Sequence, residues 1–239
     1  MKLFQSKKVL VANFGSFHLQ RLIDTSNNST PIVYVHTNPR LLMTTRFSLG
    51  FCFISYFVGI LNTALRNLLP PNVKLDLARM IHSIFDLEVS IRLLICRPRI
   101  FVGLSSFSSW TLFICKYLDV KSVVSHGSLS LEYDRQILKT YLPLKVAMAE
   151  IAPIWCIDRE RREFKLADKV HVLSKLSAET IGKYSGRPID TFVITRPPVS
   201  PIFSQFSGVQ LFRARRQAFR NQISIIGSIC GRKGFFRII

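Results

Sequence analysis

Acidic residues are scarce in this sequence. It has 14 Asp and Glu against 33 Lys and Arg over 239 residues, which gives a formal net charge of +19. Such a surface attracts phosphates, anionic lipid head groups and nucleic acid alike, so charge alone does not select a partner. Hydrophobic residues make up 48% of the chain, which is enough to bury a full core and excludes a disordered chain.

Paired cysteines are also missing. The five cysteines are an odd number, are widely spaced and include no C-x-x-C pair. Most lie in apolar stretches, where a reduced cysteine packs as a small hydrophobe. We therefore expect a reducing, cytoplasmic location, no disulfide framework and no zinc or other metal site.

The chain has no apolar run of the ~20 residues that cross a bilayer. The basic N-terminus precedes only a short apolar run without a cleavage pattern, which argues against a signal peptide. Residues 47–61, FSLGFCFISYFVGIL, carry no charge. A buried core helix is the favoured interpretation of this segment. A face that dips into an anionic membrane, helped by Arg40, Arg46 and Arg66, remains open, and a true span is the weakest alternative.

Strand and helix signals alternate along the chain. Short apolar runs bounded by turn residues predict strands, and longer periodic segments predict helices. The predicted strands are residues 9–14, 32–36, 99–104, 122–125, 169–173, 192–195 and 223–226. The predicted helices are residues 107–118, 157–168 and a segment from about 177, where Ser177 would be the N-cap. This alternation predicts an α/β fold with a Rossmann-like, mainly parallel sheet flanked by helices.

Several familiar catalytic motifs are absent. The sequence contains no H-E-x-x-H, no G-x-S-x-G, no Walker lysine loop and no full G-x-G-x-x-G. Zinc-protease, hydrolase and ATPase interpretations lose their main support.

Three places could contact an anionic ligand. Gly15 ends the first predicted strand, where a missing Cβ lets a phosphate approach or simply allows a tight turn. His126 ends the fourth, at the sheet edge where ligands bind; it would either donate to a sugar hydroxyl or phosphate, or be hydrogen-bonded within the protein. Arg232 and Lys233, beside Gly234, place two cations next to a flexible backbone and suit a diphosphate.

Two runs of charged residues are interpreted as surface features and not as binding sites. Glu160, Glu163 and Asp168 lie among arginines on one predicted helix, and we interpret them as a solvated face with pairs at helical spacing. The arginines of residues 211–220 lack the interleaved aromatic residues that stack on bases, which argues against nucleic-acid binding.

Taken in order, five segments resemble the family 4 glycosyltransferases, retaining enzymes of the GT-B fold with two Rossmann-like domains facing a cleft. The most specific is IDRERREFKLADKVHVLSKLSAETI: a charged helix ending in Ala-Asp, a short strand ending in serine, and a further helix. The others are KVLVANFGSF, SVVSHGSLSLEYDRQIL, PPVSPIF and ISIIGSICGRKG. The matches run from about residue 8 to the end, although residues 40–95 contribute little.

The resemblance implies transfer of a sugar from a nucleotide sugar to a glycan or lipid-linked acceptor, as in cell-surface polysaccharide synthesis, with no metal and no cofactor beyond this co-substrate. Gly15, with the adjacent Ser16, would lie near the donor phosphates and His126 near the transferred sugar as the catalytic residue. Lys233 would be the phosphate-binding lysine, assisted by Arg232, because Ser228 stands where many members have an arginine.

By the same resemblance, residues 1–205 form the N-terminal acceptor-side domain, 206–222 a basic linker or helix, and 223–239 the start of the donor-binding domain. The family's E-x7-E segment is missing from the sequence. We therefore expect little or no transferase activity from this chain alone, unless a separate chain supplies the donor half. Such an enzyme would work in the cytoplasm, at the inner face of the cytoplasmic membrane. The alternatives are a non-catalytic membrane- or glycan-binding remnant of such an enzyme and, more weakly, a nucleic-acid binder.

Overall fold

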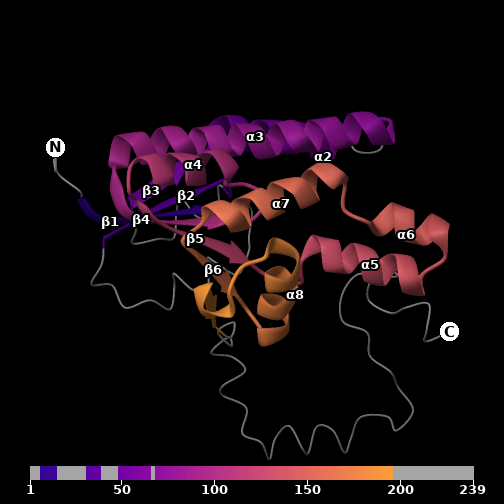
Figure 1. Ribbon diagram of the computed structural model, residues 1–239. Coiled ribbons are helices and arrows are strands. Elements are labelled where there is room, and N and C mark those ends of the chain that lie inside the picture. The colour runs from indigo at the N-terminus through magenta and orange to yellow at the C-terminus, as the bar shows by residue number, and fades with distance from the viewer. Residues whose placement is uncertain (1–5, 15–30, 39–47, 66–67, 196–239) are drawn as a thin grey trace, which may run out of the picture.

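One sheet organises the molecule. The computed structural model describes residues 6–14, 31–38, 48–65 and 68–195 (Figure 1). The described strands form a seven-stranded sheet in the order β3-β2-β1-β4-β5-β6-β7, and every pairing is parallel. The strands are β1 (Ser6–Asn13), β2 (Ile32–His36), β3 (Ser48–Phe51), β4 (Pro98–Leu104), β5 (Lys121–His126), β6 (Lys169–Val172) and β7 (Phe192–Ile194). The order runs outward from β1 in both directions, so the predicted Rossmann-like α/β class is confirmed.

Six of the predicted strands are present, within a few residues of their expected limits, and the one at residues 223–226 lies outside the described residues. Side chains of successive strand residues point to opposite faces, which divides the core in two. Leu10 and Ala12 of β1 face the main core, whereas Val11 joins Tyr34 in a small cluster on the other face.

The main core lies under four helices: α3 (Pro71–Cys96), α4 (Ser109–Tyr117), α7 (Ile154–Leu166) and α8 (Lys175–Ser185). Fully buried side chains from these helices meet the strand residues there, among them Phe85, Leu112, Phe164 and Ile181. Burying large apolar side chains of this kind supplies most of the stabilisation of an α/β domain. The described cysteines are all free thiols, and Cys52 and Cys115 are buried in this core.

The prediction of a buried core helix at residues 47–61 is wrong. Residues 48–51 instead form strand β3, which pairs with β2, and the helix α2 (Phe53–Leu65) begins after it. Within α2, which is described in full, Ser55 is the one buried residue. The helix packs beside α3 (Figure 1), and several of its apolar side chains are exposed.

Helices α5 (Leu131–Tyr141) and α6 (Leu144–Glu150) extend away from the sheet beyond the carboxyl end of β5 (Figure 1). A single 3-10 turn, η2 (Ile189–Thr191), leads into β7. None of the helices that the structure describes combines the length and the apolar character needed to cross a bilayer.

The N-cap of α8 is Ser174, not the predicted Ser177. The Ser174 hydroxyl accepts a hydrogen bond from the backbone N–H of Ser177, which satisfies one of the free donors at the helix start. The helix ends at Gly186, whose φ of 72° lies in the left-handed region that glycine adopts without strain.

Candidate functional site

The carboxyl ends of the strands gather polar side chains along one edge of the sheet. Asn13 ends β1, His36 ends β2 and His126 ends β5, and all three are buried. Crossovers leave β1 and β4 in opposite directions, so these two strands form the topological switch point of the sheet. Ligands of open parallel sheets bind at this edge. It is therefore the candidate functional site.

His126 is held by the protein at both ring nitrogens. Nδ1 lies 2.7 Å from Ser105 Oγ, and Nε2 lies 2.9 Å from the carbonyl oxygen of Leu129 and 3.1 Å from Ser128 Oγ. Because a carbonyl only accepts, Nε2 carries a hydrogen, and Nδ1 shares a hydrogen bond with the Ser105 hydroxyl. His126 is 4% exposed, so its ring is fixed in place within the described structure. Of its two predicted roles, the geometry favours the internally hydrogen-bonded histidine.

Glu160 of α7 lies against this histidine. Its Oε2 is 3.6 Å from His126 Nδ1 and has no hydrogen-bond partner among the described residues, whereas Oε1 accepts the N–H of Leu131 at the start of α5. Burial raises the pKa of Glu160 to about 8, although the Leu131 N–H lowers it. The carboxyl group therefore keeps its proton to a higher pH than an exposed glutamate does.

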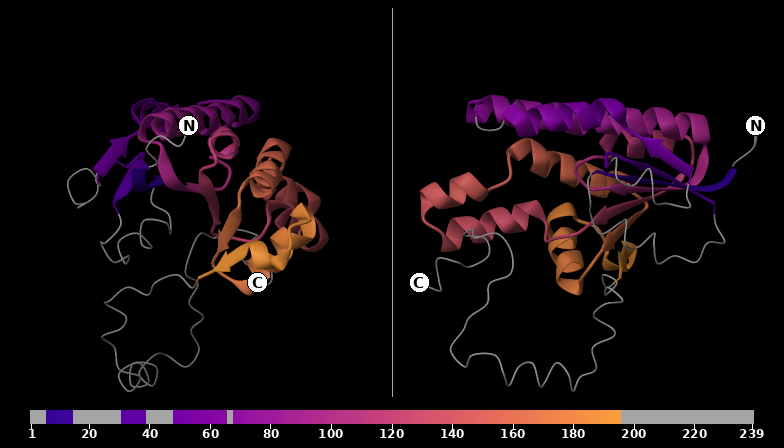
Figure 2. Two further views of the ribbon diagram at one scale, coloured as in Figure 1. Left: turned by 60° about the vertical axis from the view of Figure 1, so that its left-hand side comes forward. Right: turned by 180° about the vertical axis from the view of Figure 1, so that it is seen from behind.

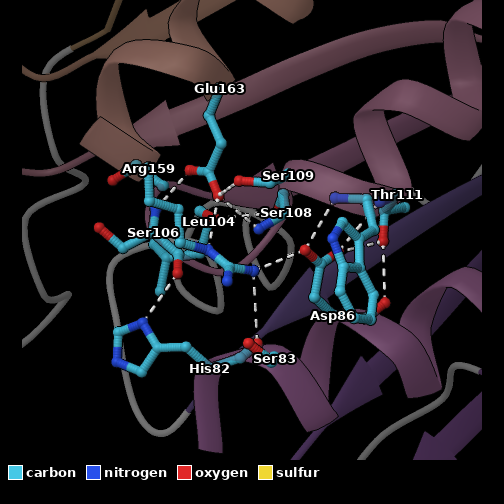
Figure 3. A network of polar contacts seen from close by, with 12 residues as sticks. His82, Ser83, Asp86, Leu104, Ser106, Ser108, Ser109, Thr111, Arg159 and Glu163 are labelled. Atoms are coloured by element: carbon cyan, nitrogen blue, oxygen red, sulfur yellow. Dashed lines mark hydrogen bonds and ion pairs between the residues drawn. The ribbon is translucent and has the colours of Figure 1, made fainter. Parts of the chain in front are cut away.

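A second buried group of charges joins α3, α4 and α7 (Figure 3). Arg159 Nη2 lies 2.5 Å from Asp86 Oδ2, and Arg159 Nε lies 3.3 Å from Glu163 Oε1. The two carboxylates are fully buried, and the arginine side chain is 12% exposed. Removing one partner from such a set leaves an uncompensated buried charge, which is strongly destabilising.

Both carboxylates bind the N-terminus of α4 and the loop before it. Asp86 accepts the backbone N–H groups of Trp110 and Thr111, and Glu163 accepts those of Ser106 and Ser108 together with the Ser109 hydroxyl (Figure 3). Negative charge at a helix N-terminus is favourable, because the free N–H groups and the helix dipole point at it. These contacts fix the β4–α4 loop at the candidate site.

Ser106 in this loop has a φ of 71°, a left-handed conformation that is uncommon for a residue with a side chain. Its N–H is bound by Glu163, and its carbonyl accepts from His82 Nδ1 at 2.8 Å. Burial lowers the pKa of His82 to about 4, so this ring is neutral at physiological pH. The surroundings thus hold a strained backbone at the edge where a ligand would bind.

The interpretation of the charge run on α7 as a solvated face is wrong for two of its three residues. Glu160 is 2% exposed and Glu163 is fully buried, whereas Asp168 is exposed and accepts the Ser122 N–H. Burial also raises the pKa of Glu163 to about 7. A signal was available in the sequence: Glu160 lies three residues after Ile157 and four before Phe164, inside the apolar stripe of the helix.

An aromatic stack adjoins the switch point. Phe14, which follows β1, stacks on Phe107 at 4.6 Å between ring centroids, and Phe107 stacks on His82 at 3.9 Å. Trp155 of α7 meets His82 edge-on. The packed rings link the end of β1 to the β4–α4 loop. They are apolar groups close to the polar side chains at the carboxyl edge of the sheet.

Of the predicted site residues, His126 is the one that the structure describes. Gly15, Ser16, Arg232 and Lys233 lie outside the described residues, so their donor-binding role stays a prediction. Sequence reasoning missed Asp86, Arg159 and His82, because their burial depends on partners far away in the chain. Within the described residues, no cluster of His, Cys, Asp and Glu could hold a metal ion.

Comparison with known proteins gives structural likenesses alone. No family model matches the sequence, and no curated protein matches it. Among solved structures, Os79 from O. sativa in complex with UDP is 14% identical over 93% of this chain and 61% of its own, with a TM-score of 0.49. UGT2 of Phytolacca americana, complexed with UDP-2fluoro-glucose and pterostilbene, is 12% identical over 82% and 53%, with a TM-score of 0.48.

UDP-GlcNAc 2-epimerase from Neisseria meningitidis, bound to UDP-GlcNAc, is 13% identical over 79% of this chain and 45% of its own, with a TM-score of 0.43. The chain spans about half the length of these structures. The class that the topology itself defines is a Rossmann-like α/β domain.

Proposed function

We propose that this chain is the acceptor-side half of a GT-B glycosyltransferase, which transfers a sugar from a nucleotide sugar to a glycan or lipid-linked acceptor in cell-surface polysaccharide synthesis. One observation carries the proposal: the two longest segments of the resemblance form consecutive elements at the candidate edge. Residues 122–138 form β5, its following loop and most of α5, and residues 157–181 form most of α7, then β6 and the start of α8.

In this proposal the donor lies across the switch point. Its diphosphate would meet Gly15 and Ser16, which follow Phe14 directly, together with Arg232 and Lys233. Positive groups that stabilise a departing diphosphate lower the barrier to transfer electrostatically, without a metal. The sugar would lie at the end of β5, beside His126 and the exposed residues Gly127 and Ser128.

His126 would have to change a partner in order to act on the sugar. Its Nε2 hydrogen points to the carbonyl of Leu129, so donation to a sugar hydroxyl requires the loop of residues 127–130 to move. The Glu160 carboxyl at 3.6 Å from Nδ1 would then stabilise the rearranged ring. We assign His126 the contact with the sugar and Glu160 a positioning role.

A non-catalytic glycan-binding module is the second candidate. The observation in its favour is that both ring nitrogens of His126 already have partners within the protein and that the ring is almost fully buried. Such a module would bind a glycan without turning over any nucleotide sugar. Radiolabelled sugar transfer separates the two candidates when a separate chain supplies the donor half: transfer by the two chains together supports the glycosyltransferase, and glycan binding without transfer supports the module.

The first experiment is calorimetric titration of the chain with a panel of nucleotide sugars. We expect one of them to bind and the substitution Lys233→Ala to weaken its binding, because the diphosphate loses a cation. The matched control is Lys121→Ala at the opposite, amino edge of the sheet, where the lysine is exposed. Absence of binding by every nucleotide sugar, or equal weakening by both variants, would contradict the proposal.

A further inference from the structure

The outer side of α2 carries several exposed apolar side chains. Phe53 and Phe57 are 65% and 62% exposed, and Ile60 and Leu61 are about half exposed. These residues recur at spacings of three and four, so they share one side of the helix. We call this side of α2 the outer apolar face.

Helix α2 is amphipathic, but its polar side faces the protein and its apolar side faces outward. Its buried residue, Ser55, donates its hydroxyl to Glu88 of α3, and Glu88 also accepts the N–H groups of Ile54 and Ser55. A helix of a soluble domain ordinarily turns its apolar stripe inward. Here the polar contact lies against α3, and the phenylalanines point away from the protein.

The outer apolar face lies on one of the outermost helices of the domain. Helices α2 and α3 run side by side along the top of the molecule in each view (Figure 2). Contiguous exposed apolar surface of this kind on a single chain marks an interaction site.

The charges around this face are mainly positive. Arg79 and Arg92 are exposed on α3, and Arg97 and Arg99 are exposed directly after it. Three acidic residues lie between residues 53 and 99: Asp86 is buried against Arg159, and Glu88 binds the start of α2, which leaves Asp76 exposed. The exposed ionic groups of this region therefore attract anions.

We infer that the outer apolar face is a docking surface for an anionic lipid bilayer, on which α2 lies in the plane of the interface. Phenylalanines that enter the acyl boundary and arginines that meet anionic head groups are the two contributions that hold an interfacial helix. A nucleic acid would leave the phenylalanines exposed, and a second copy of the same face would bring like-charged arginines together. This inference goes beyond the proposed function and does not depend on it.

The test is flotation of the full chain with lipid vesicles. We expect binding to phosphatidylcholine vesicles that contain roughly a quarter of phosphatidylglycerol, weak binding to phosphatidylcholine alone, and loss of binding at high salt. The double variant Phe53→Gln and Phe57→Gln should lower the affinity roughly tenfold or more, because two apolar side chains no longer enter the membrane. Its control is Leu144→Gln with Met148→Gln on α6, where both residues are 69% exposed.

A positive signal comes from the variant Phe57→Trp. Its added fluorescence should shift to the blue on vesicle binding and be quenched by brominated lipid, because the side chain leaves water. Circular dichroism of each variant confirms that the fold is retained. Unchanged vesicle binding by the Phe53 and Phe57 double variant, an equal loss in the α6 control, or an added tryptophan emission that vesicles do not shift would overturn the inference. A double variant that loses self-association but keeps vesicle binding would assign the face to a second copy.

Discussion

Helices α7 and α2 differ in burial, and each differs from what its sequence predicts. The segment rich in Arg and Glu buries two carboxylates, Glu160 and Glu163, and most of Arg159. The segment without any charge leaves Phe53 and Phe57 more than half exposed. Polarity by itself therefore does not determine burial in this protein.

The difference has a physical cause in the partners of each segment. The charges under α7 are compensated by one another and by the free N–H groups at the start of α4, which offsets the cost of removing them from water. The α2 helix is anchored to α3 by the half-buried Glu88, and the apolar side chains on its outer side are exposed. Substitutions in the two regions should consequently differ in the property that they change.

The largest effect should follow from Arg159→Leu. Asp86 and Glu163 would remain buried without their cation, so the free energy of unfolding should fall by about 3–5 kcal/mol. Urea unfolding followed by circular dichroism measures this loss. Arg162→Leu on the exposed side of the same helix is the control and should change stability little. Equal losses of stability in the two variants would show that the buried ion pairs of Arg159 do not stabilise the fold.

Stability should depend on pH through Glu160 and Glu163. Burial raises their pKa values from the ordinary 4.5 to about 8 and about 7, so between these limits the folded state holds more protons than the unfolded state. The free energy of unfolding contributed by these groups should therefore fall as the pH rises from 5 to 8.

Thermal unfolding across this range measures the slope. Glu160→Gln should flatten the slope because it removes one of the titrating groups. Glu179→Gln, at an exposed position on α8, should leave it unchanged. A slope that Glu160→Gln does not alter would rule out a buried, protonated Glu160.

Ser174 is an exposed polar residue that stabilises the start of α8 as its N-cap. Ser174→Ala removes the acceptor for the Ser177 N–H and should cost about 1 kcal/mol. Ser174→Asp keeps an acceptor and should restore most of the loss, as measured by urea unfolding. If both variants are as stable as the wild type, the cap contributes nothing.

The smallest change in stability should come from the exposed phenylalanines. Phe53→Gln and Phe57→Gln should each alter the free energy of unfolding by no more than about 0.5 kcal/mol, because the side chains are already in water. Phe85→Ala in the main core, at 0% exposure, is the contrasting control and should cost about 3–5 kcal/mol. A large loss from Phe57→Gln would show that α2 is packed against something in the free protein.

Much of the fold was predictable, because strand signals are local. Residues 9–14, 32–36 and 122–125 were assigned from short apolar runs, and the helix, strand and helix of residues 157–181 followed from their periodicity. The long helix α3 was missed, since its buried and exposed sides both carry apolar residues and its charges are spread along it. Strand β3 does not follow from the sequence, because its residues belong to one uncharged apolar run that predicts a single helix.

The candidate site was predictable only in part. The position of His126 at the carboxyl end of a strand followed from the sequence, but its contacts with Ser105 and Glu160 depend on how distant segments meet. The same holds for the pairing of Asp86 with Arg159. The donor-binding roles of Gly15, Ser16, Arg232 and Lys233 stay predictions.

The most direct test of the account is a nitrogen-15 NMR titration of the chain with the nucleotide sugar that binds in calorimetry. The account predicts that the largest amide shifts occur at the carboxyl edge, at Phe14, Ser105 and Gly127, and that Ile54 and Phe57 on α2 stay unshifted. Shifts confined to α2, or no shift at the carboxyl edge at saturating ligand, would contradict a nucleotide-sugar site at this edge of the sheet.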